Sequence, residues 1–258
     1  MKKYCLQLKV TAVDFLNDRY VLIRLTDSQP LPEMAPGQFV EVRVDHSPTT
    51  FLRRPISINF VDYAKNELWL LVAVVGDGTR CMSQLKPGDM LDCVFPLGNT
   101  FTMPQTPQQK YLLVGGGVGV APLLYMGMKI KEMGGEPTFL LGARSAKDLL
   151  EIELFEQYGR VLVTTEDGTA GEKGYVTNHS VLQKEHFDMI CTCGPQPMMV
   201  AVARYAEKAN IVCEASLENL MACGIGACLC CVEKTTKGNL CVCTEGPVFN
   251  TKDLLWLN

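Results

Sequence analysis

The chain has 258 residues, a formal net charge of −4 and 12 cysteines. Its length exceeds that of a typical domain, roughly 100–150 residues, and is enough for two or three small domains. With 47% hydrophobic and 20% charged residues the chain can bury real cores, so general disorder is excluded. The mild acidity disfavours nucleic acid or an anionic membrane as the main partner, because both attract a basic surface.

The N-terminal residues Met1–Gln7 contain no apolar signal-peptide core, so we expect a cytoplasmic protein whose thiols stay reduced. Clustered cysteines then indicate metal or redox chemistry rather than disulfides. The uncharged segment Tyr111–Met128 has the length of a membrane span. Its glycines and Pro122 suit a tight loop better, and we expect no membrane partner.

Short β-rich runs dominate residues 1–103, recur at roughly ten-residue spacing and are separated by turn signals such as Pro36-Gly37. This rhythm predicts an antiparallel six-stranded β-barrel. The predicted strands are Cys5–Val13, Tyr20–Leu25, Gln38–Val44, Pro55–Phe60, Leu68–Val75 and Met90–Phe95.

Residues 104–212 open with a Pro- and Gln-rich linker and then alternate strand with helix, which predicts a doubly wound parallel sheet. Residues 213–258 carry crowded cysteines and form a small C-terminal domain. The predicted strands are Tyr111–Val114, Thr138–Leu141, Arg160–Thr165 and Met189–Cys193, and the predicted helices are Pro122–Met133, Leu149–Tyr158, Val176–Leu182 and Pro197–Asn210.

The cysteine spacing is the most specific signal. Cys223, Cys228 and Cys231 follow a C-x4-C-x2-C pattern, and Cys243 comes further along the chain. Plant-type ferredoxins hold a 2Fe–2S cluster with this arrangement. Small residues between the cysteines let backbone N–H groups approach the sulfur atoms.

Two alternatives bear on this site. A structural zinc site also uses four thiolates, usually as paired C-x2–4-C knuckles, whereas only one such short pair is present here. Cys230 and Cys241 also compete for ligand roles. The spacing favours Cys231 over Cys230.

A glycine-rich run, Gly115–Pro122, follows a predicted strand and opens a predicted helix. Glycines at that place let the backbone approach a pyrophosphate, whose charge the helix N-terminus favours. Val120 stands where the dinucleotide fingerprint has its last glycine, so tight packing without a ligand is the alternative.

Glu166 and Asp167 follow the third strand of the predicted sheet. Carboxylates near the ribose accept hydrogen bonds from a 2′-hydroxyl and repel a 2′-phosphate, which favours NAD over NADP. A solvated acidic turn is the alternative.

In the predicted barrel, Arg53 and Arg54 enter a strand and Ser57 follows them. Arginines can bind phosphate bidentately and a serine can hydrogen-bond a ring, although a surface charge pair is the alternative. The turn Gly76–Thr79 offers backbone groups for a second portion of the same phosphate.

Together, Arg54–Ser57, Gly78-Thr79, Gly115–Pro122 and Cys193-Gly194-Pro195 resemble the ferredoxin–NADP reductase superfamily in order and spacing. That superfamily usually has Tyr where this chain has Ile56, so the flavin lacks aromatic cover from this position.

The C-terminal run Met221–Cys228, with Cys231 and then Cys243–Phe249, narrows the resemblance to electron-transfer subunits of type B, NAD-linked dihydroorotate dehydrogenases. The resemblance covers essentially the whole chain. In that family the fourth ligand precedes an acidic-Gly-Pro-Val-Phe run, which implies Cys243 rather than Cys241.

The resemblance implies three cofactor sites, for FAD, for NAD as co-substrate and for the 2Fe–2S cluster. Arg54 binds the FAD pyrophosphate and Ser57 lies near the reactive edge of the flavin. The FAD residues it implies are Arg54, Pro55, Ile56, Ser57, Leu71, Val72, Ala73, Gly78 and Thr79. The NAD residues are Gly115, Gly116, Gly117 and Gly119, with Cys193, Gly194 and Pro195 near the nicotinamide. The cluster ligands are Cys223, Cys228, Cys231 and Cys243.

The same resemblance implies a partner, an FMN-containing dihydroorotate dehydrogenase catalytic subunit, in a 2+2 heterotetramer that serves pyrimidine (UMP) biosynthesis. Electrons leave the FMN and reach NAD through the cluster and FAD, because FAD handles both one- and two-electron transfer. We then expect no catalytic residue for the pyrimidine on this chain. The scattered His46, His179 and His186 are expected to be structural or on the surface.

Two other functions fit parts of the pattern. One is the flavin and iron–sulfur subunit of another cytoplasmic NAD(P)H oxidoreductase complex, whose relatives show a different cysteine spacing. The other is a zinc-stabilised binding module, which is not an enzyme.

Overall fold

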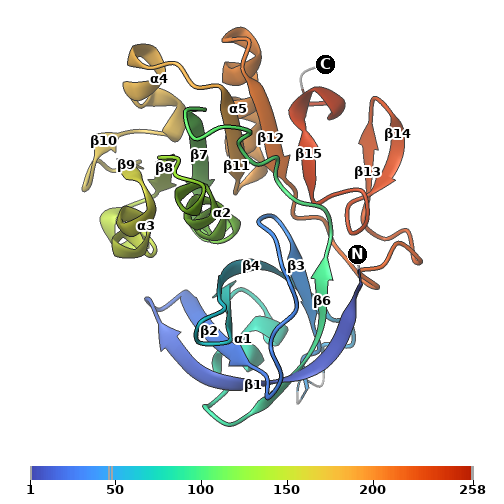
Figure 1. Cartoon of the computed structure of the whole chain (residues 1–258). Helices are drawn as coiled ribbons and strands as arrows, with labels where there is room; N and C mark the ends of the chain where they lie inside the picture. The colour runs from blue at the N-terminus through green and yellow to red at the C-terminus, as the bar shows by residue number, and fades with distance from the viewer. Residues whose placement is uncertain (1, 46, 48, 257–258) are drawn as a thin grey trace.

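The computed structural model describes residues 2–45, 47 and 49–256, so His46 lies outside the described residues. The N-terminal strands form a closed barrel in the order β1-β2-β5-β4-β3-β6 (Figure 1), with antiparallel pairing throughout. This confirms the predicted six-stranded barrel. The strands are β1 (Tyr4–Phe15), β2 (Tyr20–Thr26), β3 (Phe39–Val42), β4 (Arg54–Asp62), β5 (Glu67–Ala73) and β6 (Met90–Leu97), and the short helix α1 (Asp77–Ser83) lies between the last two.

The second part is a sheet in the order β10-β9-β8-β7-β11-β12-β15, parallel except for the last strand. Helices α2 and α3 lie on the face toward the barrel, whereas α4 and α5 cover the other face (Figure 1). This confirms the doubly wound sheet. Its elements are β7 (Tyr111–Gly116), α2 (Ala121–Glu132), β8 (Thr138–Ala143), α3 (Ile152–Tyr158), β9 (Arg160–Thr165), β10 (Glu172–Lys173), α4 (Val181–Lys184), β11 (Met189–Cys193), α5 (Gln196–Lys208), β12 (Val212–Ser216) and β15 (Val248–Asn250).

One predicted helix is interrupted. Residues Val176–Asn178 form a 3-10 turn, and the helix α4 begins only at Val181. The buried imidazole of His179 lies between them, and its Nδ1 accepts a hydrogen bond from the N–H of Val181 at 3.0 Å. His179 is therefore structural, and His186 is exposed.

The C-terminal segment leaves the sheet after β12 and returns to it as β15, which pairs antiparallel with β12. Between these strands it forms a hairpin of β13 (Val232–Thr235) and β14 (Gly238–Cys241). Sheet pairing thus continues past residue 212, and the domain boundaries at 103 and 212 stay predictions. Among the described residues, no helix combines the length and apolar character that a membrane span requires.

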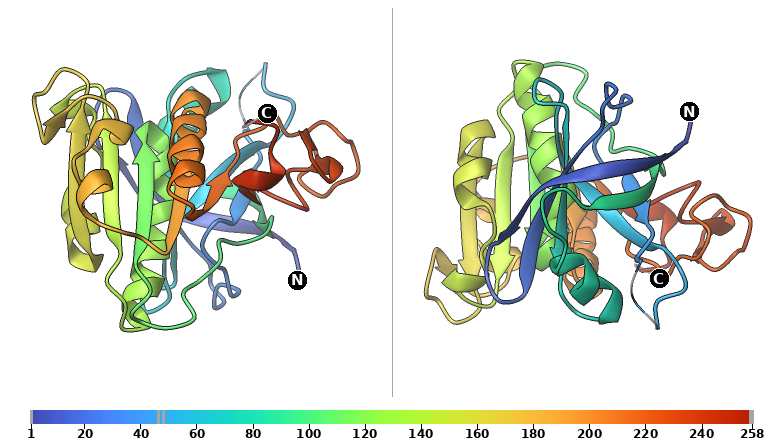
Figure 2. Two further views of the ribbon diagram at one scale, coloured as in Figure 1. Left: turned by 90° about the horizontal axis from the view of Figure 1, so that it is seen from above. Right: turned by 90° about the horizontal axis from the view of Figure 1, so that it is seen from below.

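Two apolar cores hold these parts together. The first joins the barrel to α2 and α3, and there the Tyr125 hydroxyl donates to the Met34 carbonyl at 2.9 Å. The second joins Phe39 and Leu97 on the outside of the barrel to β12 and to the cysteine-rich segment. Burial of these apolar surfaces fixes both the sheet and the cysteine-rich segment against the barrel (Figure 2).

Candidate functional site

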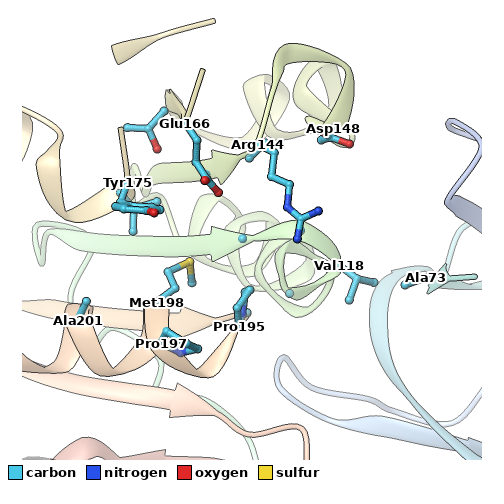
Figure 3. A pocket seen from close by; sticks show the side chains of 18 of the residues that line it. Ala73, Val118, Arg144, Asp148, Glu166, Tyr175, Pro195, Pro197, Met198 and Ala201 are labelled. Atoms are coloured by element: carbon cyan, nitrogen blue, oxygen red, sulfur yellow. The ribbon is translucent and has the colours of Figure 1, made fainter. Parts of the chain in front are cut away.

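A cavity of about 780 Å³ lies at the carboxyl ends of β7, β8, β9 and β11, where they face the barrel. Its barrel wall includes Tyr20 and Ala73, and its sheet wall includes Gly142 and Thr164. Figure 3 shows Ala73 on the barrel side and Glu166 on the sheet side. In doubly wound sheets ligands bind outside the carboxyl ends of the strands. The cavity therefore lies where a nucleotide is expected.

The glycine-rich turn after β7 forms the floor of this cavity. A Cβ on Gly119 would lie 2.4 Å from the Gly194 Cα, so only glycine lets the two loops touch. Gly117 has a φ of +57°, a conformation that glycine adopts without strain. Gly116, Gly117 and Gly119 line the cavity, whereas Gly115 packs beneath it, where a Cβ would lie 3.0 Å from side-chain atoms of Leu123 and Val120.

The segment Cys193-Gly194-Pro195 faces this turn. Gly194 and Pro195 line the cavity. Cys193 lies just below the surface, 1% exposed, and burial raises the pKa of its thiol well above the ordinary value. A thiol in this state is inert and serves packing rather than chemistry.

The two acidic residues after β9 differ. Glu166 lines the cavity. Asp167 accepts hydrogen bonds from the backbone N–H and the hydroxyl of Thr169, at 3.0 and 2.7 Å, and these bonds lower its pKa. Of the two, only Glu166 is available to a bound ribose.

Several lining residues were not predicted from the sequence, among them the polar Arg144, Tyr175 and Glu218. Arg144 follows β8 as Glu166 follows β9. Because ligands bind at the carboxyl ends of parallel strands, the residues after each predicted strand would have included Arg144. Tyr175 and Glu218 lie in irregular segments and reach the cavity through the folding of the chain. Burial raises the pKa of the Glu218 carboxyl.

The two arginines at the start of β4 have different surroundings. Arg53 forms an ion pair with Asp92 at 2.6 Å and donates to the Asp92 carbonyl at 3.0 Å, so it serves the barrel. The Arg54 guanidinium lies beside Gly78, where a Cβ would approach its Nε to 3.2 Å. One Arg54 nitrogen donates to the carbonyls of Leu52 and Arg53 at 3.1 and 3.2 Å, so the guanidinium is held close to Gly78.

The other predicted FAD residues lie on β4, on β5 and at the start of α1. Pro55, Ile56 and Ser57 are half-buried on β4, opposite β3. The Thr79 hydroxyl is bonded to backbone groups of Val75 and Gly76, so it shapes the turn before α1. Leu71 and Val72 are buried in the barrel core, while Ala73 reaches the cavity.

Backbone N–H groups point at the cysteine sulfurs. The Cys223 Sγ accepts from Ile225 and Ala227 at 3.5 and 3.3 Å, and the Cys243 Sγ accepts from Gly226 at 3.1 Å. The Ile225 contact leads the causes that lower the pKa of Cys223 to about 6. Such N–H groups stabilise the thiolates that an iron–sulfur cluster requires.

The four predicted ligands lie as two pairs, Cys223 with Cys228 and Cys231 with Cys243, and in the second pair the Cys243 N–H donates to the Cys231 Sγ at 3.4 Å. Within the described residues, no three or more metal-binding side chains are already gathered around one point. Two pairs of thiols suit a cluster with two irons and four thiolates.

Cys230 and Cys241, the alternatives to Cys231 and Cys243, are less buried than those two predicted ligands. Cys231 and Cys243 are 2% and 1% exposed, whereas Cys230 is exposed and Cys241 is half-buried. The residues present therefore fit the group that their spacing predicts.

Contacts from the barrel hold the cysteine-rich segment. The side chain of Asn99 donates to the carbonyls of Glu245 and Val248 at 2.7 and 2.8 Å and accepts from the Val248 N–H at 2.9 Å. Gly224 has a φ of +67°, and a Cβ there would lie 2.6 Å from the Glu41 Cγ. Glu41, on β3, is 0% exposed, and burial is the main cause that raises its pKa to about 7.

Comparisons with known proteins agree with this geometry. Residues 218–255 match the family described as the iron–sulfur cluster binding domain of dihydroorotate dehydrogenase B, and residues 113–204 match the oxidoreductase NAD-binding domain. The structure of an NADH-dependent reduced ferredoxin-NADP oxidoreductase has a TM-score of 0.87 and 29% identity, and the match covers 97% of this chain and 90% of that one. A ferredoxin NADP+ reductase from Neisseria gonorrhoeae, at 14% identity and a TM-score of 0.65, shares the fold.

Two relatives share the name "Dihydroorotate dehydrogenase B (NAD(+)), electron transfer subunit". The protein from Caldanaerobacter subterraneus subsp. tengcongensis is 40% identical over 86% of this chain and 87% of its own length. The protein from Listeria monocytogenes serotype 4a is 39% identical over 96% of this chain and 98% of its own length. This chain therefore belongs to the family of electron transfer subunits of NAD-linked dihydroorotate dehydrogenase B.

Proposed function

We propose that this chain accepts electrons from a partner subunit that oxidises dihydroorotate and delivers them, by way of a 2Fe–2S cluster and FAD, to NAD+. The partner carries FMN, and two copies of each subunit form a heterotetramer that acts in pyrimidine biosynthesis. The observation that carries the proposal is the seating of the cysteine pairs against the same barrel that places Arg54 beside Gly78. This chain is thus an oxidoreductase component without dihydroorotate chemistry of its own.

The NAD side of the proposal is supported by the cavity at the strand ends. Gly116, Gly117 and Gly119 line the cavity, and the backbone at Gly117 is open to a pyrophosphate, because a Cβ there would meet only the Tyr20 hydroxyl at 3.5 Å. Gly194 and Pro195 lie across the cavity from Ala73 of the barrel. A nicotinamide bound between them faces Ala73 at the end of β5, where we place the flavin.

The FAD side is supported by Arg54, Gly78 and the half-buried residues Pro55–Ser57 of β4. FAD, when bound, exchanges two electrons with a nicotinamide and single electrons with an iron–sulfur cluster. Arg54 holds the pyrophosphate, and Pro55–Ser57 line the flavin. Ion pairing of Arg53 with Asp92 keeps this strand in place.

The partner side is supported by the surface around the exposed pair of cysteines. Leu220, Ile225 and Leu229 are 86%, 51% and 65% exposed and flank Cys223 and Cys228 in the chain. Apolar side chains gathered at one place on a surface favour contact with another protein. All twelve cysteines are free of disulfides, which fits a cytoplasmic complex.

The test is to purify the chain alone and together with the FMN-containing subunit encoded by the same organism. The chain alone should show flavin bands with broad cluster absorption, and both should bleach with NADH. The complex should form NADH from dihydroorotate and NAD+, and native mass spectrometry should give two copies of each chain. A colourless, zinc-loaded chain would contradict the proposal.

A further inference from the structure

Two oppositely charged side chains follow neighbouring strands at the cavity. The parallel register pairs Gly142 with Thr164 and Ala143 with Thr165, so Arg144 and Glu166 come next, side by side. The backbone confirms this order, because the Glu166 N–H donates to the Ala143 carbonyl at 3.1 Å. Both side chains reach into the cavity (Figure 3).

Both charges are free to meet a ligand. Within the described part of the chain, neither the Arg144 guanidinium nor the Glu166 carboxylate has a hydrogen bond or an ion pair. Their polar neighbours are already engaged, since Asp167 is bonded to Thr169 and Asp148 accepts from the Ser145 hydroxyl at 2.8 Å. The loops after β8 and β9 thus present Arg144 and Glu166 to the cavity as an unpaired cation and an unpaired anion among the described residues.

Glu166 lies toward the adenosine half of a bound dinucleotide, and the Arg144 guanidinium lies between Glu166 and the barrel (Figure 3). In Figure 3, Ala73 of the barrel is at one end of the cavity, and Tyr175 and Ala201 are at the other, with Glu166 on their side. The nicotinamide must face the barrel to exchange a hydride with a flavin there. The adenine ribose then lies near Arg144 and Glu166.

We propose that Arg144 and Glu166 form a charge selector for the 2′ position of the adenine ribose. Glu166 accepts a hydrogen bond from the 2′-hydroxyl of NAD and repels the 2′-phosphate of NADP. Arg144 is a ready ligand for the 2′-phosphate of NADP, so only the charge of Glu166 rejects that phosphate. This inference rests on the proposed function, because it names the selectivity of the same cavity.

Isothermal titration of the full chain, purified with its cofactors, with NAD+ and with NADP+ tests the selector. Glu166→Gln keeps a hydrogen-bond acceptor but removes the charge, and should improve NADP+ affinity relative to NAD+ by about tenfold. Adding Arg144→Ala to that variant should remove the gain. Arg144→Ala alone should leave NAD+ preferred.

Asp167→Asn is the matched comparison, because it removes a neighbouring charge that does not line the cavity while Asn can still accept from Thr169. It should leave the ratio of the two affinities unchanged. The selector is overturned if Glu166→Gln leaves the ratio unchanged, if Asp167→Asn shifts it equally, or if the gain persists without Arg144. Failure of the unmodified chain to bind NAD+ overturns the proposed function and the selector together.

Discussion

The dinucleotide cavity and the cluster segment achieve binding in opposite ways. The cavity takes its shape from strand ends and from glycines such as Gly119, whose backbone touches Gly194 with no room for a side chain. The segment between β12 and β15 has only one short hairpin, and its cysteine sulfurs meet backbone N–H groups in loops. Packing of regular structure preforms the cavity, whereas the cluster segment depends on the cofactor to bring its two thiol pairs together.

The largest expected effect is on the cluster. Cys243→Ser removes one of two thiolates in the buried pair, so the cluster absorption and its electron paramagnetic resonance signal should vanish while the flavin bands remain. Cys241→Ser is the matched control and should retain both cofactors. Loss of the cluster in Cys241→Ser instead would assign the fourth ligand to Cys241.

The next largest effect is on protein stability, through Glu151 at the interface between the barrel and the sheet domain. Glu151 is enclosed there, its Oε1 accepts from Asn59 at 2.9 Å, Arg24 lies nearby, and burial is the main cause that raises its pKa to about 7. Between pH 4.5 and 7 the unfolded chain loses this proton first, so stability falls as pH rises through that window.

Glu151→Gln removes the loss of stability between pH 4.5 and 7, because glutamine has no carboxyl group to titrate. Its advantage in the free energy of unfolding should be absent below pH 4.5 and reach up to about 3 kcal/mol above pH 7, at roughly 1.4 kcal/mol per pKa unit. Denaturant unfolding at pH 4.5 and pH 8 measures the difference. Equal curves for both proteins at pH 8 would show that the interface tolerates the charge.

A smaller effect tests whether the cavity is preformed. Gly119→Ala places a Cβ 2.4 Å from the Gly194 Cα and must separate the two loops, which costs on the order of 1–3 kcal/mol. NAD+ affinity, measured by calorimetry, should fall roughly tenfold to a hundredfold. Unchanged flavin and cluster spectra serve as the internal control, and unchanged NAD+ affinity would mean that the loops adapt to the ligand.

The smallest effect separates the two arginines. Arg53→Ala should lower the stability of the barrel by roughly 2 kcal/mol, because Asp92 is then left with Arg43 at 3.2 Å and Gln7 at 3.0 Å. Arg54→Ala should leave that stability unchanged and weaken flavin retention during gel filtration. Equal loss of flavin in both variants would contradict the division of roles.

The sequence predicted the elements whose pattern is local. All six barrel strands and four parallel strands of the sheet follow from their own residues and turns. Strand β12 and its antiparallel partner β15 were not predicted, because their pairing joins distant residues around a cysteine-rich loop. The break at His179 depends on one side-chain hydrogen bond, which helical periodicity does not reveal.

For the candidate site, residue type and spacing indicated which chemistry to expect but not which neighbour performs it. Glu166 and Asp167 are adjacent and alike, and only the hydrogen bonds of Thr169 distinguish them. Arg53 and Arg54 likewise differ in their partners, because Arg53 pairs with Asp92 and Arg54 lies beside Gly78. Partners of this kind come from other strands and loops, so they became visible only in the folded chain.

The pairing of β15 with β12 makes the cluster segment an insertion between two strands that lie side by side. Since both ends of the insertion are fixed by the sheet, little further loop-closure entropy is lost when the cluster forms. Residues of the insertion such as Met221 and Val242 share an apolar core with Phe39 and Leu97 of the barrel. The cluster is therefore anchored at a junction, with the nucleotide sheet holding both ends of its segment and the barrel holding the middle.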